Sequence, residues 1–498
     1  MSHAPSDWEV VIGLEVHVQL RTRAKVFASS SWGFGQEPNE QVDPVVLGLP
    51  GTLPVVNREA VEKAILFGLV VGAEIPERCA WDRKNYFYPD NPKNYQLTQK
   101  DFPVVLGGRL EIELPGASRN VMGEHKFIRI HHAHLEEDVG KLSHAGNGSL
   151  VDYNRAGVPL LEIVTEPDLR SSAEAEAFLR SLVAMLTQAG VADCDMEKGQ
   201  LRCDCNVSVR RRGDAKLGTR TETKNLNSIS SVRDTVLYET ARQVRELEAG
   251  RTITQETRGW NAELARGYVL RDKEDAHDYR YFPDPDIPTL KISRETVARL
   301  ARQVPENLYD RQRRYVEKLG LPFTAASVLV ADRALSAWFE VAVAAHPANP
   351  QGIANLVAND LLRDLAASAG TAGASAPAPV SLASCRIKPA QLAGLVKLTD
   401  DGVISKQQAK EVFAEMFKSG QAAAAIVEAK GLRQNSDTRE LEKIVQEVIA
   451  DPAVAKSIAE YRAGNEKAIN ALKGPIMKRT QGKANPVLID QLLRKFLG

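Results

Sequence analysis

Apolar and polar residues alternate along two segments in the first half of the chain. Residues 8–20 read WEVVIGLEVHVQL and residues 201–210 read LRCDCNVSVR, with an apolar residue at every second position. This period of two is the pattern of a strand that buries one face and exposes the other. We therefore predict two half-buried strands whose polar faces carry charged side chains.

The second strand is expected to return through a turn as a hairpin. If the turn centres near Gly213, Asp204 lies opposite Glu222 and Arg202 lies opposite Lys224. Like charges directly opposite each other destabilise a sheet unless a counter-ion separates them. The hairpin therefore predicts a divalent cation between the acids and an anion, such as phosphate, between the bases. A solvated face on which these charges never meet is the alternative that remains open.

Two further groups of acids supply partners for this hairpin. Glu15 and His17 are neighbours on the polar face of the first strand, and Glu136, Glu137 and Asp138 follow the strand-like run FIRIHHAHL. Adjacent carboxylates repel one another unless they face water or a cation. Hard oxygen ligands favour Mg²⁺ or Mn²⁺, and the chain has no HExxH or CxxC spacing that would indicate a zinc enzyme or zinc finger. An exposed acidic turn is the alternative for residues 136–138.

A stiff loop, RKNYFYPDNPKNYQL, adds basic groups at Lys84 and Lys93. Loops of this composition can hold a nucleotide base and its phosphates, or they can be structural loops packed by their own tyrosines. No Walker loop and no GxGxxG motif after a strand occurs, so a nucleotide would not bind through a P-loop or a dinucleotide fold.

Helical periodicity separates an α+β first part from a helical second part. Helices are predicted at Glu59–Gly72, Ser171–Ala189 and Val232–Ala249, and a further strand at Leu160–Val164. From Ser293 onward the pattern is helical, with a low-complexity insertion near 366–380 and a basic C-terminal end. We predict three domains, at residues 1–292, 293–404 and 405–498.

Composition limits the classes of protein. The chain has 498 residues, of which 43% are hydrophobic and 26% charged, and its formal net charge is zero. It offers no bulk attraction to nucleic acid, so a polyanion must meet a local basic patch. No apolar run reaches membrane-spanning length, and the N-terminus lacks a leader pattern. Five scattered cysteines do not make a disulfide framework, which predicts a cytoplasmic location.

Several motifs, in order along the chain, resemble the signatures of one family. They are GLEVHVQL, RKNYFYPDNPKNYQ, HLEEDVGK, DYNRAGVPLLEIVTEPD, LRCDCNVSVR and TETKNLNS. The C-terminal GPIMKRTQGKANPVLIDQLL resembles the tail domain of the same family, which also occurs as a small stand-alone helical protein. The family is the B subunit of the tRNA-dependent amidotransferases, which convert Glu-tRNA(Gln) or Asp-tRNA(Asn) to the amide.

The resemblance implies an α+β fold with a glutamine-synthetase-like antiparallel-sheet cradle domain that binds ATP and Mg²⁺. An all-helical domain and a small helical tail domain that contacts the tRNA would follow. The residues implied as metal ligands are Glu15, His17, Glu136, Glu137, Asp204 and Glu222. Lys84 and Lys93 are implied as the basic residues that border the metal site.

In this interpretation ATP first phosphorylates the aminoacyl side chain, because an oxide is a poor leaving group, and ammonia then displaces phosphate. Mg²⁺, or Mn²⁺, would neutralise charge on the transferred group. The residues expected to bind the nucleotide are Lys84, Lys93, Arg202 and Lys224. The catalytic candidates are Lys84, Glu136 and Glu137, and one of the two acids would accept a proton from an incoming ammonium ion.

The resemblance also implies partners. An amidase, the A subunit, frees ammonia from glutamine, a small C subunit ties the two larger subunits together, and ammonia passes through a tunnel. The cognate non-discriminating aminoacyl-tRNA synthetase is a candidate further partner, and no membrane is involved. Two other functions remain open: a free-standing ATP-dependent ligase that amidates a small acid, and a non-catalytic scaffold that binds tRNA.

One segment departs from the family pattern. Many relatives carry four cysteines after the first strand, which bind a structural zinc ion. Here Ala28, Ser30, Asp43 and Val46 stand at the corresponding positions. We therefore expect no zinc in this loop, which must be held by packing instead.

Overall fold

The computed structural model describes residues 7–272, 278–368, 382–433, 438–480, 484 and 486–498. The chain divides into two compact units, Met1–Arg311 (unit 1) and Gln312–Gly498 (unit 2). The insertion expected near 366–380 falls largely on residues 369–381, which lie outside the described residues. Among the described residues, no helix combines the length and the apolar character that a membrane span requires.

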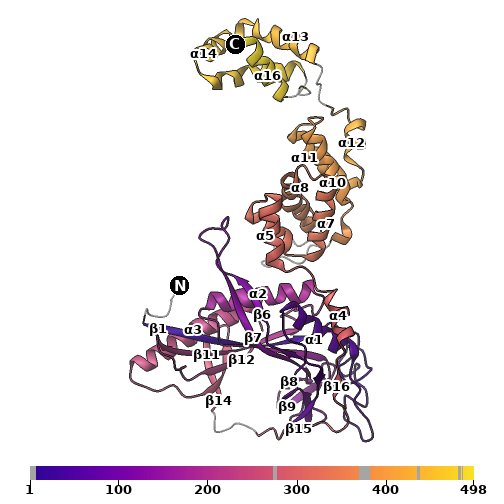
Figure 1. Cartoon of the computed structure of the whole chain (residues 1–498), viewed down its shortest axis with the longest axis vertical. Helices are drawn as coiled ribbons and strands as arrows, with labels where there is room; N and C mark the ends of the chain where they lie inside the picture. The colour runs from indigo at the N-terminus through magenta and orange to yellow at the C-terminus, as the bar shows by residue number, and fades with distance from the viewer. Residues whose placement is uncertain (1–6, 273–277, 369–381, 434–437, 481–483, 485) are drawn as a thin grey trace. The chain divides into compact units, whose positions relative to one another are not determined.

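Unit 1 is built on a nine-stranded, largely antiparallel sheet (Figure 1). Its strands, in spatial order, are β14 (Arg266–Asp272), β13 (Glu256–Asn261), β12 (Thr221–Leu226), β11 (Leu201–Arg211), β1 (Trp8–Gln19), β10 (Pro159–Thr165), β7 (His125–Glu137) and β5 (Val105–Leu106), with β6 (Arg109–Glu113) also paired to β7. Only the β12–β13 pair is parallel within this sheet. The predicted α+β class, with an antiparallel-rich sheet followed by helices, is confirmed at this level.

Three helices cover one face of this sheet (Figure 1), namely α1 (Arg58–Val70), α2 (Ser172–Gln188) and α3 (Ile229–Glu248). Each matches a predicted helix to within a few residues. The helix α2 begins as expected, because the Ser171 hydroxyl accepts a hydrogen bond from the backbone N–H of Glu174. The alternate apolar residues of β1 and β11 lie in the core beneath these helices, where Val16, Leu201 and Cys203 are fully buried.

Short strands border the opposite side of the sheet. β3 (Asp82–Asn85) lies between β15 (Phe282–Pro283) and β4 (Tyr95–Thr98) in a small antiparallel sheet. Two further pairs are β16 (Leu290–Lys291) with β2 (Arg78–Cys79), and β8 (Lys141–Ala145) with β9 (Gly148–Asp152). The loop with Lys84 and Lys93 therefore belongs to a β-hairpin.

The predicted antiparallel pairing of β11 with β12 is confirmed, but its predicted register is wrong. Glu222 lies opposite Asn206, not Asp204, and the register shifts between Cys203 and Cys205. The extra residue is on β12, where Asn225 has a φ of +58°. The Asn206–Glu222 pair places the centre of the turn at Asp214, one residue later than predicted, and the bulge then moves the pairs beyond Cys205 by one further residue. Arg202 is paired with His17 on β1, not with Lys224.

Unit 2 is helical, as predicted from residue 293 onward, and α4 (Arg294–Ala301) precedes it. Its helices are α5 (Leu308–Leu319, which begins in unit 1), α6 (Phe323–Val330), α7 (Arg333–Ala345), α8 (Pro350–Asn355), η2 (Leu356–Leu361), α9 (Leu362–Ser368), α10 (Pro389–Asp400), α11 (Lys406–Ser419), α12 (Ala423–Ala429), α13 (Thr438–Ile449), α14 (Ala455–Arg462), α15 (Asn470–Arg479) and α16 (Pro486–Leu497). The last of them share a core of their own, which includes Leu441, Leu472 and Leu493.

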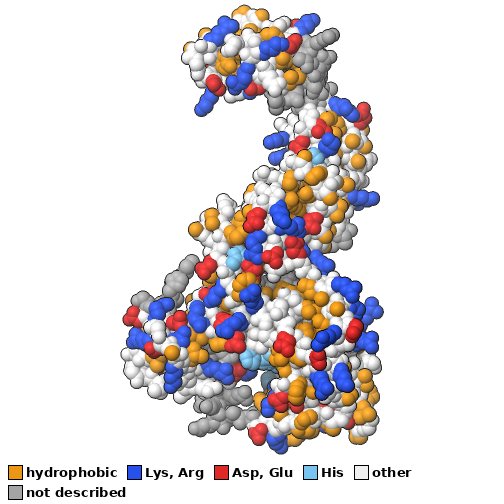
Figure 2. All heavy atoms as spheres, in the orientation of Figure 1, with side chains coloured by type: hydrophobic (Ala, Val, Ile, Leu, Met, Phe, Trp, Pro, Cys, Tyr) orange, Lys and Arg blue, Asp and Glu red, His pale blue; other side chains and the backbone are white. Residues whose placement is uncertain are grey.

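The basic C-terminal end is partly neutralised by acids from other helices. Lys473 pairs with Asp490, Arg479 with Glu447, and Lys495 with Glu442, at 2.7, 3.2 and 2.8 Å respectively. On the face of unit 2 drawn in Figure 2, basic and acidic side chains are interspersed. The local excess of positive charge is therefore smaller than the sequence of this segment alone indicates.

Candidate functional site

Charged side chains gather on the polar face of the large sheet, which is the face not covered by α1, α2 and α3. Glu15 and His17 point to this face because their neighbours along β1 point into the core. The register places Asp204 opposite Glu15, on β11, and Glu162 opposite His17, on β10. Glu162 is in turn opposite His134 on β7. Residues paired in this way share one face of the sheet.

Five side chains on this face form what we call the acid–histidine cluster: Glu15, His17, His134, Glu136 and Glu162. His17 Nε2 lies 3.4 Å from Glu15 Oε1, and His17 Nδ1 lies 3.5 Å from Glu136 Oε1. Glu162 Oε2 lies between the two imidazoles, 3.8 Å from His17 Nδ1 and 3.3 Å from His134 Nε2. Glu162 thus belongs to two groups of side chains, and within each group the donor atoms lie within 4.8 Å of one another. We call them the metal-ligand groups; one is Glu15, His17 and Glu162, and the other is His134, Glu136 and Glu162.

Burial and the charges of neighbouring side chains shift the pKa values of this cluster in opposite directions. Burial raises the pKa of Glu15, but the hydrogen bond and positive charge of His17 outweigh it and lower that pKa to about 2. Burial also opposes ionisation of Glu136, and again His17 holds the pKa below its usual value. Burial disfavours the charged form of His17, yet the carboxylates of Glu136 and Glu15 raise its pKa well above the usual value. The cluster therefore requires a positive charge at its centre.

The donor set fits a divalent metal ion. Among the described residues, His17 Nδ1 and His134 Nδ1 are buried without a hydrogen-bond partner. A buried polar atom left without a partner costs about 1–3 kcal/mol, and a metal ion bound to His17 Nδ1 would remove this cost. Each group has two carboxylates and one imidazole, which suits Mn²⁺ or Mg²⁺. The residues that could hold an ion are those of the two metal-ligand groups, Glu15, His17 and Glu162 or His134, Glu136 and Glu162.

Lys84 supplies positive charge beside the cluster. It lies on β3, with its ammonium 4.9 Å from the centre of the Tyr279 ring. Burial alone would lower the pKa of Lys84, but the negative charge of Glu136 outweighs it and raises that pKa. A lysine that stays charged at a buried acidic site can balance a phosphate without titrating.

Lys93 and Glu137 form a separate buried ion pair. Lys93 Nζ donates to Glu137 Oε1, and the same oxygen accepts a hydrogen bond of 2.9 Å from the backbone N–H of Leu97. Glu137 follows Glu136 directly, so the pleat of β7 turns its side chain to the other face. Among the described residues, Glu137 belongs to neither metal-ligand group.

Asp204 and Glu222 are bridged by a lysine. Lys224 Nζ lies 3.0 Å from Asp204 Oδ2 and 3.1 Å from Glu222 Oε1. Asp204 also accepts a hydrogen bond of 2.8 Å from the backbone N–H of Asn225, at the bulge. The acids predicted to face each other thus share an ammonium group. Neither belongs to a metal-ligand group within the described part of the chain.

Arg202 pairs with Asp138, which lies just beyond the end of β7. Arg202 Nη2 is 3.1 Å from Asp138 Oδ1, and Gln19 Nε2 donates to Asp138 Oδ2 at 3.0 Å. Burial raises the pKa of Asp138, but the charges of Arg202 and Arg155 outweigh it and lower that pKa. Arg202 therefore compensates a buried carboxylate.

Sequence reasoning missed two members of the cluster, Glu162 and His134. The signal for Glu162 was present, because this acid interrupts the apolar run LLEIV of a predicted strand. A charge at the centre of such a run marks a strand with one functional face. His134 is less visible, because it stands among other histidines in HHAH.

The loop that lacks the four cysteines is held by other groups. Asp43 Oδ1 accepts hydrogen bonds of 2.9 Å from the backbone N–H groups of Val45 and Val46, and Asp43 Oδ2 accepts one of 3.2 Å from the backbone N–H of Ser30. The Val46 side chain is buried. Two of the four substituted positions, Ser30 and Asp43, are therefore joined directly.

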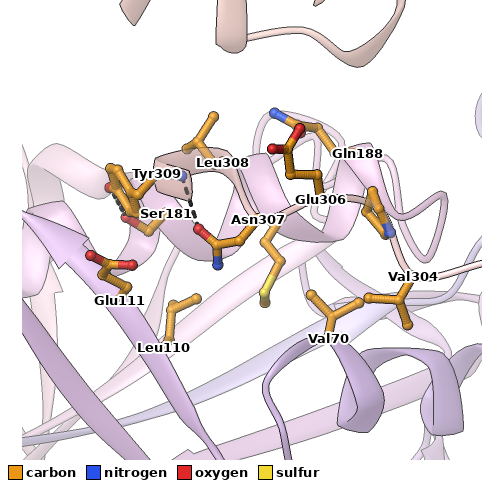
Figure 3. A pocket seen from close by; sticks show the side chains of 12 residues that line it. Val70, Leu110, Glu111, Ser181, Gln188, Val304, Glu306, Asn307, Leu308 and Tyr309 are labelled. Carbon is orange, nitrogen blue, oxygen red and sulfur yellow. Dashed lines mark hydrogen bonds between the residues drawn. The ribbon is translucent and has the colours of Figure 1, made fainter. Parts of the chain in front are cut away.

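A pocket lies on the helix-covered side of unit 1, between α2, β6 and residues 304–309 (Figure 3). Ser181 Oγ and Tyr309 OH are 2.6 Å apart there, and Asn307 Oδ1 accepts from the backbone N–H of Tyr309. Its titratable lining groups are Glu111, Glu306 and Tyr309, and none of the described residues that line it is a lysine, arginine or histidine. This pocket does not suit a phosphate.

Comparison with known proteins gives matches along the whole chain. The model of the GatB/GatE catalytic domain matches residues 10–298, and the model of the GatB domain matches residues 337–497. A protein of Opitutus terrae is 52% identical, one of Carboxydothermus hydrogenoformans 47% and one of Persephonella marina 44%. These alignments cover 99% of this chain and 99–100% of each relative. Each relative is named as the B subunit of an aspartyl/glutamyl-tRNA(Asn/Gln) amidotransferase.

Proposed function

Because the chain belongs to the family of aspartyl/glutamyl-tRNA(Asn/Gln) amidotransferase B subunits, we propose that it amidates the Glu or Asp carried by a misacylated tRNA. The observation that carries the chemistry is the acid–histidine cluster, in which Glu162 joins two groups of metal ligands. In the proposed reaction an oxygen of the side-chain carboxylate attacks the γ-phosphorus of ATP, and ADP leaves. Ammonia then attacks the acyl carbon, phosphate leaves, and the nitrogen loses a proton.

The proposed roles follow the geometry of the cluster. Glu15, His17, Glu136 and Glu162 would hold Mg²⁺ or Mn²⁺, which when bound supplies positive charge to the phosphates. Lys84 would balance the transferred phosphoryl group, because it keeps its charge beside Glu136. A carboxylate whose pKa is lowered is a weak base, so metal binding suits Glu136 better than proton acceptance.

The other predicted site residues receive secondary roles in this proposal. Lys224 would contact a phosphate beside Asp204 and Glu222, which could bind a second cation once Lys224 turns to the phosphate. Lys93 and Arg202 hold the buried carboxylates of Glu137 and Asp138, so we assign them to the support of the site.

The proposed architecture extends the antiparallel sheet to a glutamine-synthetase-like cradle over residues 1–292. Residues 293–404 would form a helical domain, and 405–498 a tail that contacts tRNA. Support for a separate tail is the apolar core shared by the last helices. We further propose that the chain works with an amidase that supplies ammonia and with a small third protein of the same complex, in the cytoplasm.

The test of the function is the dependence of ATP cleavage on the aminoacyl-tRNA. In the complex with the partner proteins, ADP release and amide formation should both require misacylated Glu-tRNA or Asp-tRNA. Uncharged tRNA and free glutamate or aspartate are the matched controls, and neither should support ADP release. ADP release of equal rate with the free amino acid would instead indicate a free-standing amide ligase.

A further inference from the structure

Two acidic side chains on the polar face of the large sheet, Asp204 of β11 and Glu222 of β12, are held in matching ways. One oxygen of each contacts the ammonium of Lys224, at 3.0 Å from Asp204 Oδ2 and 3.1 Å from Glu222 Oε1. The other oxygen of each accepts a neutral hydrogen bond. Asp204 Oδ1 accepts from the backbone N–H of Asn225 at 2.8 Å. Glu222 Oε2 accepts from the hydroxyl of Thr257 at 3.1 Å. The outer oxygens are thus fixed, and the inner ones are directed at a single cation position.

Thr257 reaches Glu222 from the neighbouring strand, β13. The strands β12 and β13 run parallel, and the register pairs Glu222 with Thr257 and Thr223 with Arg258. Threonine is branched at Cβ, so its χ1 is restricted in a strand and the backbone defines the direction of its hydroxyl. The position of β13 therefore decides where this hydroxyl lies.

A buried network of ion pairs fixes β13 on the helix-covered side of the sheet. Arg258 follows Thr257 directly, so the pleat turns its side chain to the opposite face. Arg258 Nε lies there 3.0 Å from Glu239 Oε1 of α3, and the two side chains are only 7% and 1% exposed. Arg242 of α3 pairs with Glu239 at 2.9 Å and with Glu256 of β13 at 3.6 Å. Because this network anchors β13 to α3, it also sets the position of the Thr257 hydroxyl.

The hydroxyl matters most when Lys224 turns away. Within the described part of the chain, the Glu222 carboxylate makes a hydrogen bond or ion pair with two side chains, Lys224 and Thr257. In the proposed function Lys224 turns to a phosphate, and a second cation takes its place between Asp204 and Glu222. Thr257 is then the side chain that keeps Glu222 Oε1 directed at this position. A hydroxyl is neutral, so it orients the carboxylate without reducing the negative charge that attracts a cation.

We propose that Thr257 is a positioning residue of the reaction: its hydroxyl orients Glu222 for the divalent cation that binds between Asp204 and Glu222 when Lys224 contacts a phosphate. The inference rests on the proposed function, because that function supplies the phosphates. Thr257 acts through Glu222 and touches neither the cation nor the substrate. The two inner oxygens already lie on either side of one positive charge, the ammonium of Lys224, so the place suits a cation.

Three substitutions separate the hydroxyl from the rest of the threonine. Thr257→Val keeps the branched shape but removes the hydroxyl, Thr257→Ala removes both, and Thr257→Ser keeps the hydroxyl. The matched control is Thr235→Val, because the Thr235 hydroxyl on α3 is buried without a hydrogen-bond partner among the described residues. The same chemical change therefore breaks no hydrogen bond there.

The measurement is the binding of Mn²⁺ by the full chain with a non-hydrolysable ATP analogue, followed by electron paramagnetic resonance. Wild type is expected to bind one ion at the acid–histidine cluster and a second ion between Asp204 and Glu222. Thr257→Val and Thr257→Ala should raise the Kd of one ion by about tenfold or more, because a hydrogen bond to a charged group is lost, and leave the other within about twofold. Thr257→Ser should stay within about threefold of wild type, and Thr235→Val should bind both ions as wild type does.

Unchanged Mn²⁺ binding by Thr257→Val would overturn the proposal, and a loss of unfolding free energy alone would then make the residue structural. A Thr257→Ser variant that binds the second ion as weakly as Thr257→Val does would also overturn it, as would wild-type chain that binds a single ion. If Thr257→Val does not fold, the comparison of Thr257→Ala with Thr257→Ser decides. None of these outcomes contradicts the proposed function, which fails only if ADP release by the complex does not require misacylated tRNA.

Discussion

Glu162→Gln is expected to lower ATP-dependent amide formation by about a thousandfold, the loss seen when a group that stabilises transition-state charge is removed. Glu162 is the member that the two metal-ligand groups share, and its Oε2 lies 3.8 Å from His17 Nδ1 and 3.3 Å from His134 Nε2. The substitution keeps the volume of the side chain but removes its charge. Amide formation and ADP release by the assembled complex, with misacylated tRNA, are the measurements.

The matched control for this variant is Glu166→Gln. Glu166 follows the same strand, β10, but belongs to neither metal-ligand group of the described residues. The Glu166→Gln variant should form the amide at a rate within about twofold of wild type. The release of ammonia from glutamine by the amidase partner should persist in both variants. If Glu162→Gln formed the amide at the wild-type rate, the cluster would not be the catalytic metal site.

Lys93→Met is expected to reduce the free energy of unfolding of the chain by about 3–5 kcal/mol, the cost of leaving one charge of a buried ion pair without its partner. The Lys93 and Glu137 side chains are only 7% and 6% exposed. Methionine keeps the apolar stem of the lysine but removes its charge. Denaturant unfolding of the full chain, without nucleotide or metal, is the measurement.

A second substitution separates the lost charge from any lost packing. In Lys93→Met with Glu137→Gln no charge remains buried, so most of the stability should return. Lys198→Met is the control, because Lys198 pairs with Asp195 at the surface, where solvent screens the pair, and its loss should change stability far less. Lys93→Met with wild-type stability would show that Lys93 is not structural, and its assignment to the nucleotide would regain support.

The alternating pattern predicted the parts of the fold that depend on one face being buried. It placed Glu15 and His17 on the polar side of β1, and the buried Cys203 and Cys205 of β11 confirm the opposite side. The helix α2 was equally readable, because Ser171 caps it and a glycine follows its end. These features are local, so a single segment contains the information that specifies them.

The features that were missed have different physical causes. The turn between β11 and β12 centres one residue later than predicted, and the bulge at Asn225 shifts the register again beyond Cys205; no local pattern in this hairpin indicated either. Glu136 and Glu137 were assigned together, although a strand turns adjacent side chains to opposite faces. That rule alone could have separated them. Lys93 was assigned to the nucleotide, because its partner Glu137 lies far along the chain.

Binding of the reaction's metal ion by the acid–histidine cluster can be observed in a crystal. The measurement is the anomalous scattering of Mn²⁺ in crystals of the full chain grown with a non-hydrolysable ATP analogue. We expect a peak about 2 Å from the carboxylate oxygens of Glu15, Glu136 or Glu162 and from a nitrogen of His17. A manganese peak confined to Asp204 and Glu222, or the absence of any peak at the cluster, would contradict this account.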